Sequence, residues 1–463
     1  MQRLLILKRY IRVVVNMKVY GGEPDEIISA LKSGDVTVAV YGLGKMGLPI
    51  AAVYADRGAT VIGVDINEDI VDGINRGINH VLEEPGLSKL VKENVSLGRL
   101  SATTDLIHAA EISDVMVAIV PTFLDEENKA DLSLLTSVCE KISKRLVAGD
   151  FVITESTLPP RTTEDIVLPI LKRSGLDIGD FGLAHCPERT SSGRAIQDIK
   201  GAYPKVVGGV DQKSTITAEA IYTVINDNGV IKVSDATTAE AVKVFEGVYR
   251  DVNIALSNQL AIICEELGID AIETFNVANT QPYSNLHMPG CGVGGHCIPV
   301  YPYFITKIVK SDTSLLKVSR EINDKMAEYT VDLAERALKE FKRELNGSNI
   351  LILGVTYRGG VKETRCSPAI SIIRILNEKG ANVSAWDPLL LKEVEVFGAQ
   401  NTPLSEAKDI DAIIVASDHA EFKQIDWEDV GKRMRNKIVV DGRDALKSSE
   451  LESHGFKFIG IGH

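Results

Sequence analysis

The sequence predicts an α/β protein with two doubly wound parallel sheets, joined by a middle domain of long helices. Short apolar runs alternate with helical patterns before residue 210 and again after residue 346, as in parallel sheets covered by helices. Between them, apolar residues recur at helical spacing over Ala236–Leu267. Because 463 residues exceed what one hydrophobic core usually serves, several domains are expected.

We place the predicted boundaries so that each covers one such pattern. They give an N-terminal extension (1–35), a first α/β domain (36–210), a helical middle domain (211–345) and a second α/β domain (346–463). The apolar run at 1–16 is interrupted by Lys8, Arg9 and Arg12 and is shorter than the roughly 20 residues of a membrane span. Met17 is a candidate start.

Composition is that of an ordinary soluble protein, with 44% hydrophobic and 25% charged residues. A net charge of −13 argues against nucleic-acid and membrane-surface binding. Six cysteines are scattered without a Cys-x-x-Cys pair, so we expect a reduced, cytoplasmic protein without a disulfide framework. No metal site is predicted.

The first domain opens with a nucleotide-binding pattern. A predicted strand at Val36–Tyr41 runs into a glycine turn and a helix, and a second strand at Thr60–Val64 ends at an acid. The glycines let a pyrophosphate approach the helix N-terminus, and the acid binds the ribose diol and repels a 2′-phosphate. This Rossmann-like unit therefore predicts NAD, bound by Gly42, Gly44, Lys45, Met46, Gly47 and Asp65.

Polar residues follow three further predicted strands, at Val115–Val120, Phe151–Thr154 and Phe181–Ala184. Open α/β sheets bind ligands just past the carboxyl ends of their strands. Candidates there are Pro121, Thr122, Glu155, Thr157, Glu188 and Arg189.

The long middle helix carries a predicted buried stripe at Val242, Phe245, Val248, Val252 and Ala255. Lys243, Arg250 and Asn253 lie off it. A helix of this length favours a bridge between domains or a dimer seam. A second long helix is predicted at 316–344.

The last domain repeats the strand–helix alternation without a clean glycine motif. Predicted strands at Asn349–Val355, Asn382–Ala385, Ala412–Ala416 and Lys437–Val440 surround a helix that follows Ser367-Pro368. Phosphate binding would need side chains here, and arginine suits it. The available cations are Arg358, Lys362, Arg365 and Arg443.

The segment Pro289–Phe304 is the most unusual stretch of the chain. Four glycines and a histidine precede Cys297, and prolines stand at 289, 299 and 302. Glycines let backbone approach closely, and prolines fix turns. We expect a rigid loop that presents one thiol, either as a nucleophile or as a buried cysteine in a turn.

Together these features resemble the UDP-glucose/UDP-N-acetylmannosamine dehydrogenases, which oxidise nucleotide sugars to uronic acids. The resemblance spans 36–463, and its most specific segment is Gly-Val-Gly-Gly-His-Cys-Ile-Pro-Val at 292–300. Cys186-Pro-Glu188-Arg189 and Arg250-Asp-Val-Asn253-Ile-Ala look like the N-acetylmannosamine branch.

The resemblance implies an NAD-dependent, four-electron oxidation of the sugar C6 alcohol, through a thiohemiacetal and a thioester on Cys297. It implies that Lys243 stabilises the oxyanion, Thr157 positions water and Glu188 assists proton transfer. It assigns substrate contacts to Glu188, Arg189, Lys243, Arg250, Asn253, Asn285, Gly294, Tyr301, Arg358 and Arg365. It also places Trp386–Pro388 and Ser417–His419 near the second nucleotide site.

UDP-N-acetylmannosamine is the leading substrate, followed by UDP-N-acetylglucosamine, UDP-N-acetylgalactosamine and UDP-glucose, and a homodimer or higher homo-oligomer is expected. Four positions depart from the family pattern: Gly247 replaces asparagine, Tyr301 aspartate, Ser192 glutamate and Tyr283 arginine. Gly247 and Tyr301 favour a second hypothesis, a nucleotide-sugar-binding protein without turnover. A third is a two-electron 3-hydroxyacid-type dehydrogenase, which would not need Cys297.

Overall fold

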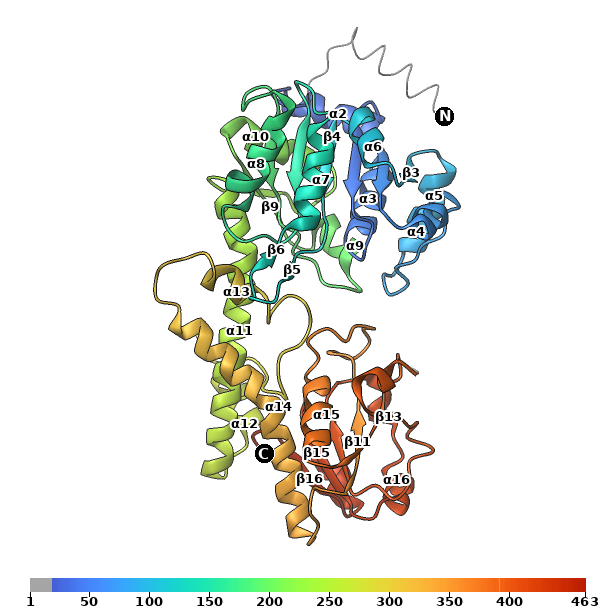
Figure 1. The fold of residues 1–463 in the computed structure, drawn as a ribbon, viewed down its shortest axis with the longest axis vertical. Coiled ribbons are helices and arrows are strands. Elements are labelled where there is room, and N and C mark those ends of the chain that lie inside the picture. Colours follow the sequence, from blue (N-terminus) through green and yellow to red (C-terminus); the bar gives the residue numbers. More distant parts are fainter. Residues whose placement is uncertain (1–18, 391) are drawn as a thin grey trace. The chain divides into compact units, whose positions relative to one another are not determined.

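The structure is a computed structural model that describes residues 19–390 and 392–463 (Figure 1). The chain divides into two compact units, Met1–Phe245 with Tyr303–Ile308, and Glu246–Pro302 with Val309–His463. The predicted run at 1–16 and the candidate start at Met17 lie outside the described residues. The boundaries at 35, 210 and 345 stay a prediction.

The first unit is built on an eight-stranded sheet in the order β10-β9-β8-β7-β4-β1-β2-β3, in which β8 and β9 pair antiparallel and all other neighbours are parallel. The strands are β1 (Thr37–Tyr41), β2 (Thr60–Val64), β3 (Leu100–Thr103), β4 (Val115–Ala118), β7 (Phe151–Thr154), β8 (Gly182–His185), β9 (Lys205–Gly209) and β10 (Val230–Lys232). β5 (Phe123–Leu124) and β6 (Ala130–Asp131) form a separate hairpin.

Helices cover both faces of this sheet because its strands are apolar on both sides. In β1, Val38 and Val40 join one hydrophobic cluster, while Ala39 and Tyr41 join another. The helices are α2 (Pro24–Ser33), α3 (Gly47–Asp56), α4 (Glu68–Asn75), α5 (Leu87–Ser96), α6 (Leu106–Ile112), α7 (Ser133–Ser143), α8 (Leu168–Leu171), α9 (Ala195–Gln197) and α10 (Gln212–Thr223).

The second unit holds a six-stranded parallel sheet in the order β13-β12-β11-β14-β15-β16. Its strands are β11 (Asn349–Leu353), β12 (Asn382–Trp386), β13 (Gln400–Asn401), β14 (Ala412–Val415), β15 (Ile438–Asp441) and β16 (Lys457–Gly460). Ile350 and Ile352 of β11 face one cluster, and Leu351 and Leu353 the other. The predicted doubly wound α/β class is thus confirmed, and the predicted strands match within two residues at each end.

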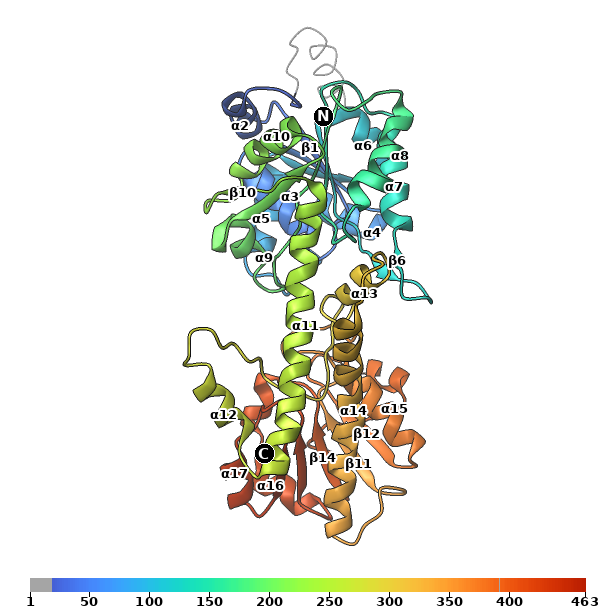
Figure 2. The same ribbon diagram turned by 90° about the vertical axis from the view of Figure 1, so that its left-hand side faces the viewer.

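Helices of the second unit are the long α14 (Ser314–Glu340) and the shorter α12 (Ala271–Ala278), α15 (Pro368–Glu378), α16 (Trp427–Arg433) and α17 (Ser448–Ser453). α11 (Ala236–Leu267) and the short α13 (Tyr301–Thr306) each have residues in both units. Figure 2 shows α11 along its length with α14 beside it. Across this contact Asp251 pairs with Arg320, and Asn323 donates 2.9 Å hydrogen bonds to both the carbonyl and the carboxylate of Asp251.

The predicted buried stripe on α11 is wrong at Phe245, which is 57% exposed. The prediction is confirmed at Ala255, but Val244, Asp251 and Asn258, which it left out, are buried as well, so the packed face is shifted from the predicted one. A hydropathy pattern assigns the most apolar face to the core. Here Asp251 and Asn258 can be buried because α14 supplies hydrogen-bond partners for both.

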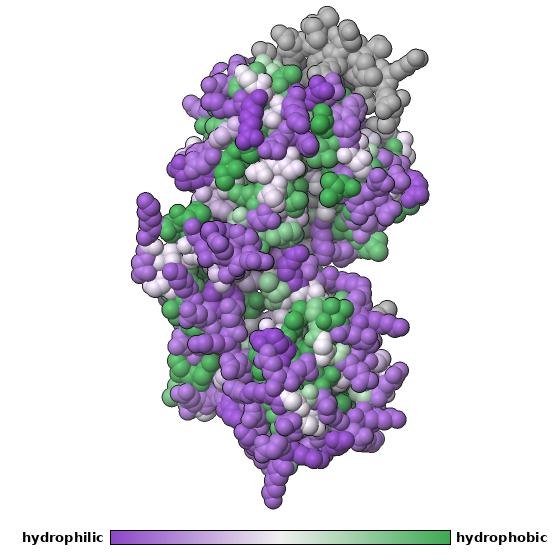
Figure 3. Space-filling view, viewed as in Figure 1, coloured by the Kyte–Doolittle hydropathy of each residue, from purple (hydrophilic) through white to green (hydrophobic). Residues whose placement is uncertain are grey.

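Within the described ranges, no helix is both long and apolar enough to cross a membrane. On the faces that Figure 3 presents, hydrophilic residues predominate and apolar residues gather in small patches.

We expect Arg320→Met to lower the free energy of unfolding by about 3–5 kcal/mol, because it leaves the buried Asp251 carboxylate without its cation. Urea unfolding followed by circular dichroism measures the change. Arg336→Met is the matched control, since its pair with Glu265 is 56% exposed on the arginine side and should contribute less than about 1 kcal/mol. Equal losses in the two variants would contradict the assignment.

Candidate active site

The turn between β1 and α3 has no room for side chains at two of its glycines. Gly42 has a φ of +98°, and a Cβ there would stand 2.5 Å from the Ile119 carbonyl oxygen. A Cβ on Gly47 would stand 1.8 Å from the Gly42 oxygen, so only glycine allows this helix–strand contact. A Cβ on Gly44 meets nothing within 4 Å, which leaves an open approach to the N-terminus of α3.

Asp65 lies at the end of β2, where its carboxylate shapes the same turn. It accepts hydrogen bonds from the backbone N–H groups of Leu43 (2.9 Å) and Asn67 (3.0 Å) while remaining partly exposed. Beside the turn, Lys45 pairs with Glu83 at 3.1 Å, and the Met46 sulfur lies 2.9 Å from the Thr190 hydroxyl.

The loops after β4 and β7 border this turn, because β4 is the neighbour of β1 at the switch point of the sheet. Ser156 joins the two loops, donating to the Val120 carbonyl at 2.7 Å and accepting from its N–H at 2.9 Å. Thr157 follows it, partly buried. The buried Thr122 hydroxyl has no hydrogen-bond partner among the described residues. A vacant donor beside an open glycine turn fits a dinucleotide.

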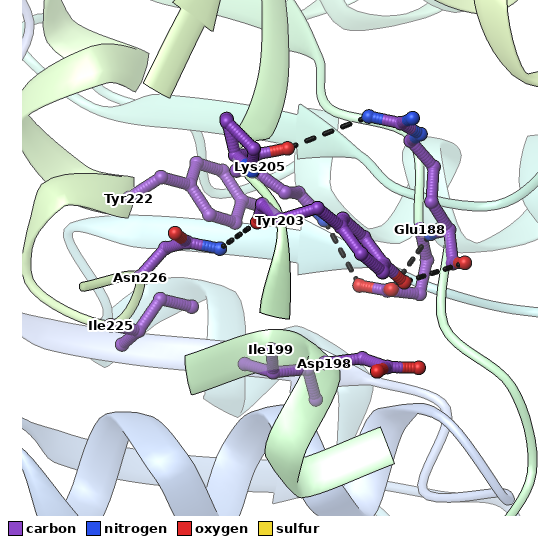
Figure 4. Close-up of a pocket in the computed structure, with 10 residues that line it drawn as sticks. Glu188, Asp198, Ile199, Tyr203, Lys205, Tyr222, Ile225 and Asn226 are labelled. Carbon is purple, nitrogen blue, oxygen red and sulfur yellow. Dashed lines mark hydrogen bonds and ion pairs between the residues drawn. The ribbon is translucent and has the colours of Figure 1, made fainter. Parts of the chain in front are cut away.

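Behind these loops lies a buried ionic cluster that the sequence did not reveal. Lys205, the first residue of β9, pairs with Glu155. It also pairs with Glu188 at 3.0 Å (Figure 4). The Tyr222 hydroxyl donates to Glu155 at 2.8 Å, and the Lys205 ammonium lies 4.8 Å from the centre of the Tyr222 ring. A lysine that opens an apolar strand was the available signal, but β9 was not among the predicted strands.

Two carboxylates share one ammonium in this cluster, so their pKa values move apart. Burial raises the pKa of Glu155 to about 7, with Glu188 adding to the rise and Lys205 opposing it. The pKa of Glu188 is lowered, since Lys205 and the hydrogen bonds to its carboxylate outweigh burial. Backbone N–H groups of Arg189 and Thr190 donate to Glu188 at 2.7 and 2.8 Å, so this residue is an ionised, fixed acceptor.

In the second unit the glycine-rich loop that carries Cys297 lies directly against the loop after β11. A Cβ on Gly294 would stand 2.6 Å from the Tyr357 Cβ, and one on Gly295 would stand 3.1 Å from the Tyr357 ring. The Gly295 N–H donates to the Arg365 carbonyl at 2.9 Å. The glycines therefore serve close backbone contact, as predicted for a rigid loop.

The start of the loop is anchored in the same way. The Gly290 N–H donates to the Asn258 side chain at 2.8 Å, and the Cys291 N–H donates to the Gly442 carbonyl at 2.9 Å. Cys291 is fully buried, whereas Cys297 is partly exposed, and neither forms a disulfide bond. Hydrogen bonding to Cys297 raises the pKa of the neighbouring His296, against the effect of burial.

At the carboxyl end of the second sheet, Asp387 repeats the role of Asp65. Its Oδ2 accepts from the N–H groups of Val355 (2.7 Å) and Thr356 (2.8 Å), which follow β11. His419 lies 3.2 Å away, and the pKa of Asp387 is lowered far below its usual range because these hydrogen bonds outweigh burial. Asp387 is buried, and its carboxylate oxygens accept hydrogen bonds from the protein itself. A carboxylate that binds a ribose would instead keep an oxygen open to the ligand.

The remaining predicted residues are divided between the two units. Lys243, Thr157 and Glu188 belong to the first unit, and Cys297 belongs to the second. Asn253 donates to the Asn285 carbonyl at 2.7 Å, which ties the loop after α12 to α11. Arg250, Arg358 and Arg365 are exposed, whereas Arg443 donates to the Ala416 carbonyl at 3.1 Å and keeps one buried nitrogen without a partner among the described residues.

We expect Lys205→Met to make stability depend strongly on pH. Without the ammonium, the pKa of Glu155 rises above about 7, so the folded protein holds a proton that the unfolded chain has released. Stability present at pH 5 is then lost as pH rises toward 8, by about 3–5 kcal/mol. Urea unfolding at both pH values measures it. Lys232→Met, which breaks the exposed pair with Glu219, is the control, and a pH-independent loss in Lys205→Met would contradict the prediction.

Comparison with known proteins places these features in one family. Three models of the UDP-glucose/GDP-mannose dehydrogenase family match in succession: the NAD binding domain over 36–226, the central domain over 237–325 and the UDP binding domain over 351–448. The UDP-N-acetyl-D-mannosamine dehydrogenase of Pyrococcus horikoshii is 38% identical over 92% of this chain and 99% of its own length.

Two further relatives agree. The NDP-N-acetyl-D-galactosaminuronic acid dehydrogenase of Ralstonia nicotianae is 35% identical over 90% of this chain and 97% of its own. A solved structure of UDP-D-ManNAc dehydrogenase from Pyrococcus horikoshii superposes with a TM-score of 0.86 at 36% identity, covering 92% of this chain and 99% of that one. With a glycine turn built for NAD and a cysteine loop packed on a second nucleotide-type sheet, the chain belongs to the UDP-glucose/GDP-mannose dehydrogenase family of NAD-dependent enzymes.

Proposed function

We propose that this enzyme oxidises C6 of a UDP-N-acetylhexosamine to the carboxylate, with UDP-N-acetylmannosamine as the first candidate. The observation that carries the proposal is the position of Cys297. Its partly exposed thiol lies on a loop whose backbone is hydrogen-bonded to the loop after β11. That second loop lies within the segment matched by the UDP binding domain. The acetamido sugars named in the relatives, mannosamine and galactosamine derivatives, support the choice of substrate class.

The proposed reaction converts an alcohol to a carboxylate in two oxidations and consumes one water. When bound, NAD supplies the hydride acceptor, once for each oxidation. Between the oxidations the Cys297 thiolate adds to the aldehyde carbon and forms a thiohemiacetal, which the second oxidation converts to a thioester. Water then displaces the thiolate and releases the acid. Sulfur suits this role because its thioester hydrolyses readily.

The first unit supplies the proposed polar groups. Glu188 is held ionised by Lys205 and two backbone N–H groups, so we assign it to accept a proton or orient water rather than to donate a proton. Lys243 is assigned to the developing oxyanion, and Thr157 to the water. The cofactor is assigned to Gly42, Gly44, Lys45, Met46, Gly47, Asp65, Pro121, Thr122 and Thr157.

The proposed sugar–nucleotide contacts are assigned residue by residue from the family resemblance. Exposed guanidinium groups at Arg358 and Arg365 suit the diphosphate, and Asn285 suits the sugar. The further assigned residues are Glu188, Arg189, Lys243, Arg250, Asn253 and Gly294.

We also propose a cytoplasmic homodimer joined along α11. Tyr249, Leu256 and Ile263 recur every seventh residue on that helix and are 50%, 48% and 41% exposed. Leu267 continues the stripe at 66% exposure. A seven-residue apolar repeat on an exposed face is suited to packing against a second helix.

Incubation of the enzyme with NAD and UDP-N-acetylmannosamine should yield about two NADH per sugar and a UDP-uronic acid. Absorbance at the nicotinamide band and mass spectrometry measure the two products. Cys297→Ser should lose acid formation, because the thioester cannot form. No NADH from any UDP-sugar, with binding intact, would favour the binding-protein hypothesis, whereas full turnover of Cys297→Ser would favour a two-electron dehydrogenase.

Asp65 should make the enzyme prefer NAD over NADP, and Asp65→Ser should narrow that preference by about tenfold or more, since one charge–charge repulsion is removed. The ratio of kcat/KM for the two cofactors measures it. Because Asp65 also accepts from Leu43, some loss of kcat/KM with NAD is expected. An unchanged ratio would show that the ribose phosphate does not meet this carboxylate.

A further inference from the structure

Tyr301 and Gly247, both within the second unit, are in direct contact. The Tyr301 N–H donates to the Cys297 carbonyl at 3.0 Å, so Tyr301 stands one turn beyond the thiol. Its side chain is 5% exposed. A Cβ on Gly247 would stand 2.1 Å from Cδ2 of the Tyr301 ring, 3.0 Å from Cε2 and 3.1 Å from Cγ. The ring therefore occupies the space that any other residue at 247 would fill.

Gly247 lies inside the 32-residue helix α11, where glycine costs about 1 kcal/mol relative to alanine. It is not among the glycines with positive φ, so backbone conformation does not require it. The close approach of the Tyr301 ring is the physical reason for a glycine at this position.

The contact also completes the attachment of the cysteine loop. The segment before Cys297 is held by Gly290, Cys291 and Gly295, through hydrogen bonds to Asn258, Gly442 and Arg365. After Cys297, the buried Tyr301 side chain packs on α11 at Gly247. Contacts on both sides thus restrain the segment between them, which carries the thiol.

We propose that Gly247 and Tyr301 are a matched pair, in which the Tyr301 ring acts as a positioning residue for Cys297. The absence of a side chain at 247 leaves space on α11, and the Tyr301 ring fills that space. The packing therefore requires both residues. A larger side chain at 247 excludes the ring, so a change at either position affects the other.

The experiment is a double-mutant cycle of Gly247→Ala, Tyr301→Ala and the double variant, each in a Cys366→Ser background that removes the exposed cysteine. Two quantities are measured: kcat for acid formation, and the rate of Cys297 alkylation by iodoacetamide across pH 6–9. A displaced reacting group costs about 100-fold, so each single variant should lose about 10- to 100-fold in kcat and shift the alkylation profile. When Tyr301 is already alanine, Gly247→Ala should lower kcat by less than about a further twofold.

Tyr301→Phe keeps the ring and should restore most of the kcat that Tyr301→Ala loses. Gly73→Ala is the matched control, a helix glycine in α4 whose added Cβ comes no closer than 3.8 Å to any atom, and it should change neither quantity. Thermal unfolding of every variant identifies any that fails to fold. If Tyr301→Ala does not fold, Tyr301→Leu is the smaller change that takes its place.

Multiplicative losses in the double variant, or no rescue by Tyr301→Phe, would overturn the proposal. The kcat readout rests on the proposed role of Cys297, and the alkylation readout does not. If Cys297→Ser keeps forming acid, the proposed function fails, while coupling between Gly247 and Tyr301 in the alkylation rate still establishes the pair.

Discussion

Close approach of backbone to backbone is the constraint on which both candidate sites depend. Gly47 lies so near Gly42 that a Cβ would come within 1.8 Å of its oxygen, and a Cβ on Gly294 would come within 2.6 Å of the Tyr357 Cβ and 3.0 Å of the Cys366 carbonyl oxygen. In the first case the approach opens a helix N-terminus to a ligand; in the second it fastens a thiol-bearing loop to a nucleotide-type sheet. Dispersion and backbone hydrogen bonds hold these contacts, and each would be lost if a side chain intervened.

Each of the two sheets has an aspartate that fixes the loop after its first strand, but the two aspartates differ in exposure. An aspartate follows the second strand of each βαβ unit, Asp65 after β2 and Asp387 after β12, and each accepts hydrogen bonds from the loop after the first strand. Asp65 stays partly exposed, so it can also meet a ribose. Asp387 is buried and paired with His419, so it organises the loop alone. Nucleotide recognition in the second unit therefore falls to other groups.

The buried ionic cluster of Lys205, Glu155 and Glu188 is the second constraint in the first unit. Glu188 is useful as an ionised acceptor because Lys205 and two backbone donors oppose the cost of its burial. The pKa of Glu155 moves the other way, because burial raises it and the nearby Glu188 adds to the rise, against the effect of Lys205. The role assigned to Glu188 thus depends on Lys205 and on the two backbone donors.

The sequence by itself determined the α/β class, the strands with continuous apolar runs, the glycine turn with Asp65 and the cysteine loop. Each depends on neighbours a few residues away, where periodicity and turn chemistry operate. It missed part of the buried face of α11, because Asp251 and Asn258 are buried only through partners on α14. It also failed on Lys205, whose two carboxylates lie 50 and 17 residues away along the chain. Only the tertiary structure decided these contacts, and with them the pairing of Gly247 with Tyr301, because the free energy of a buried charge or a missing Cβ depends on atoms that folding brings together.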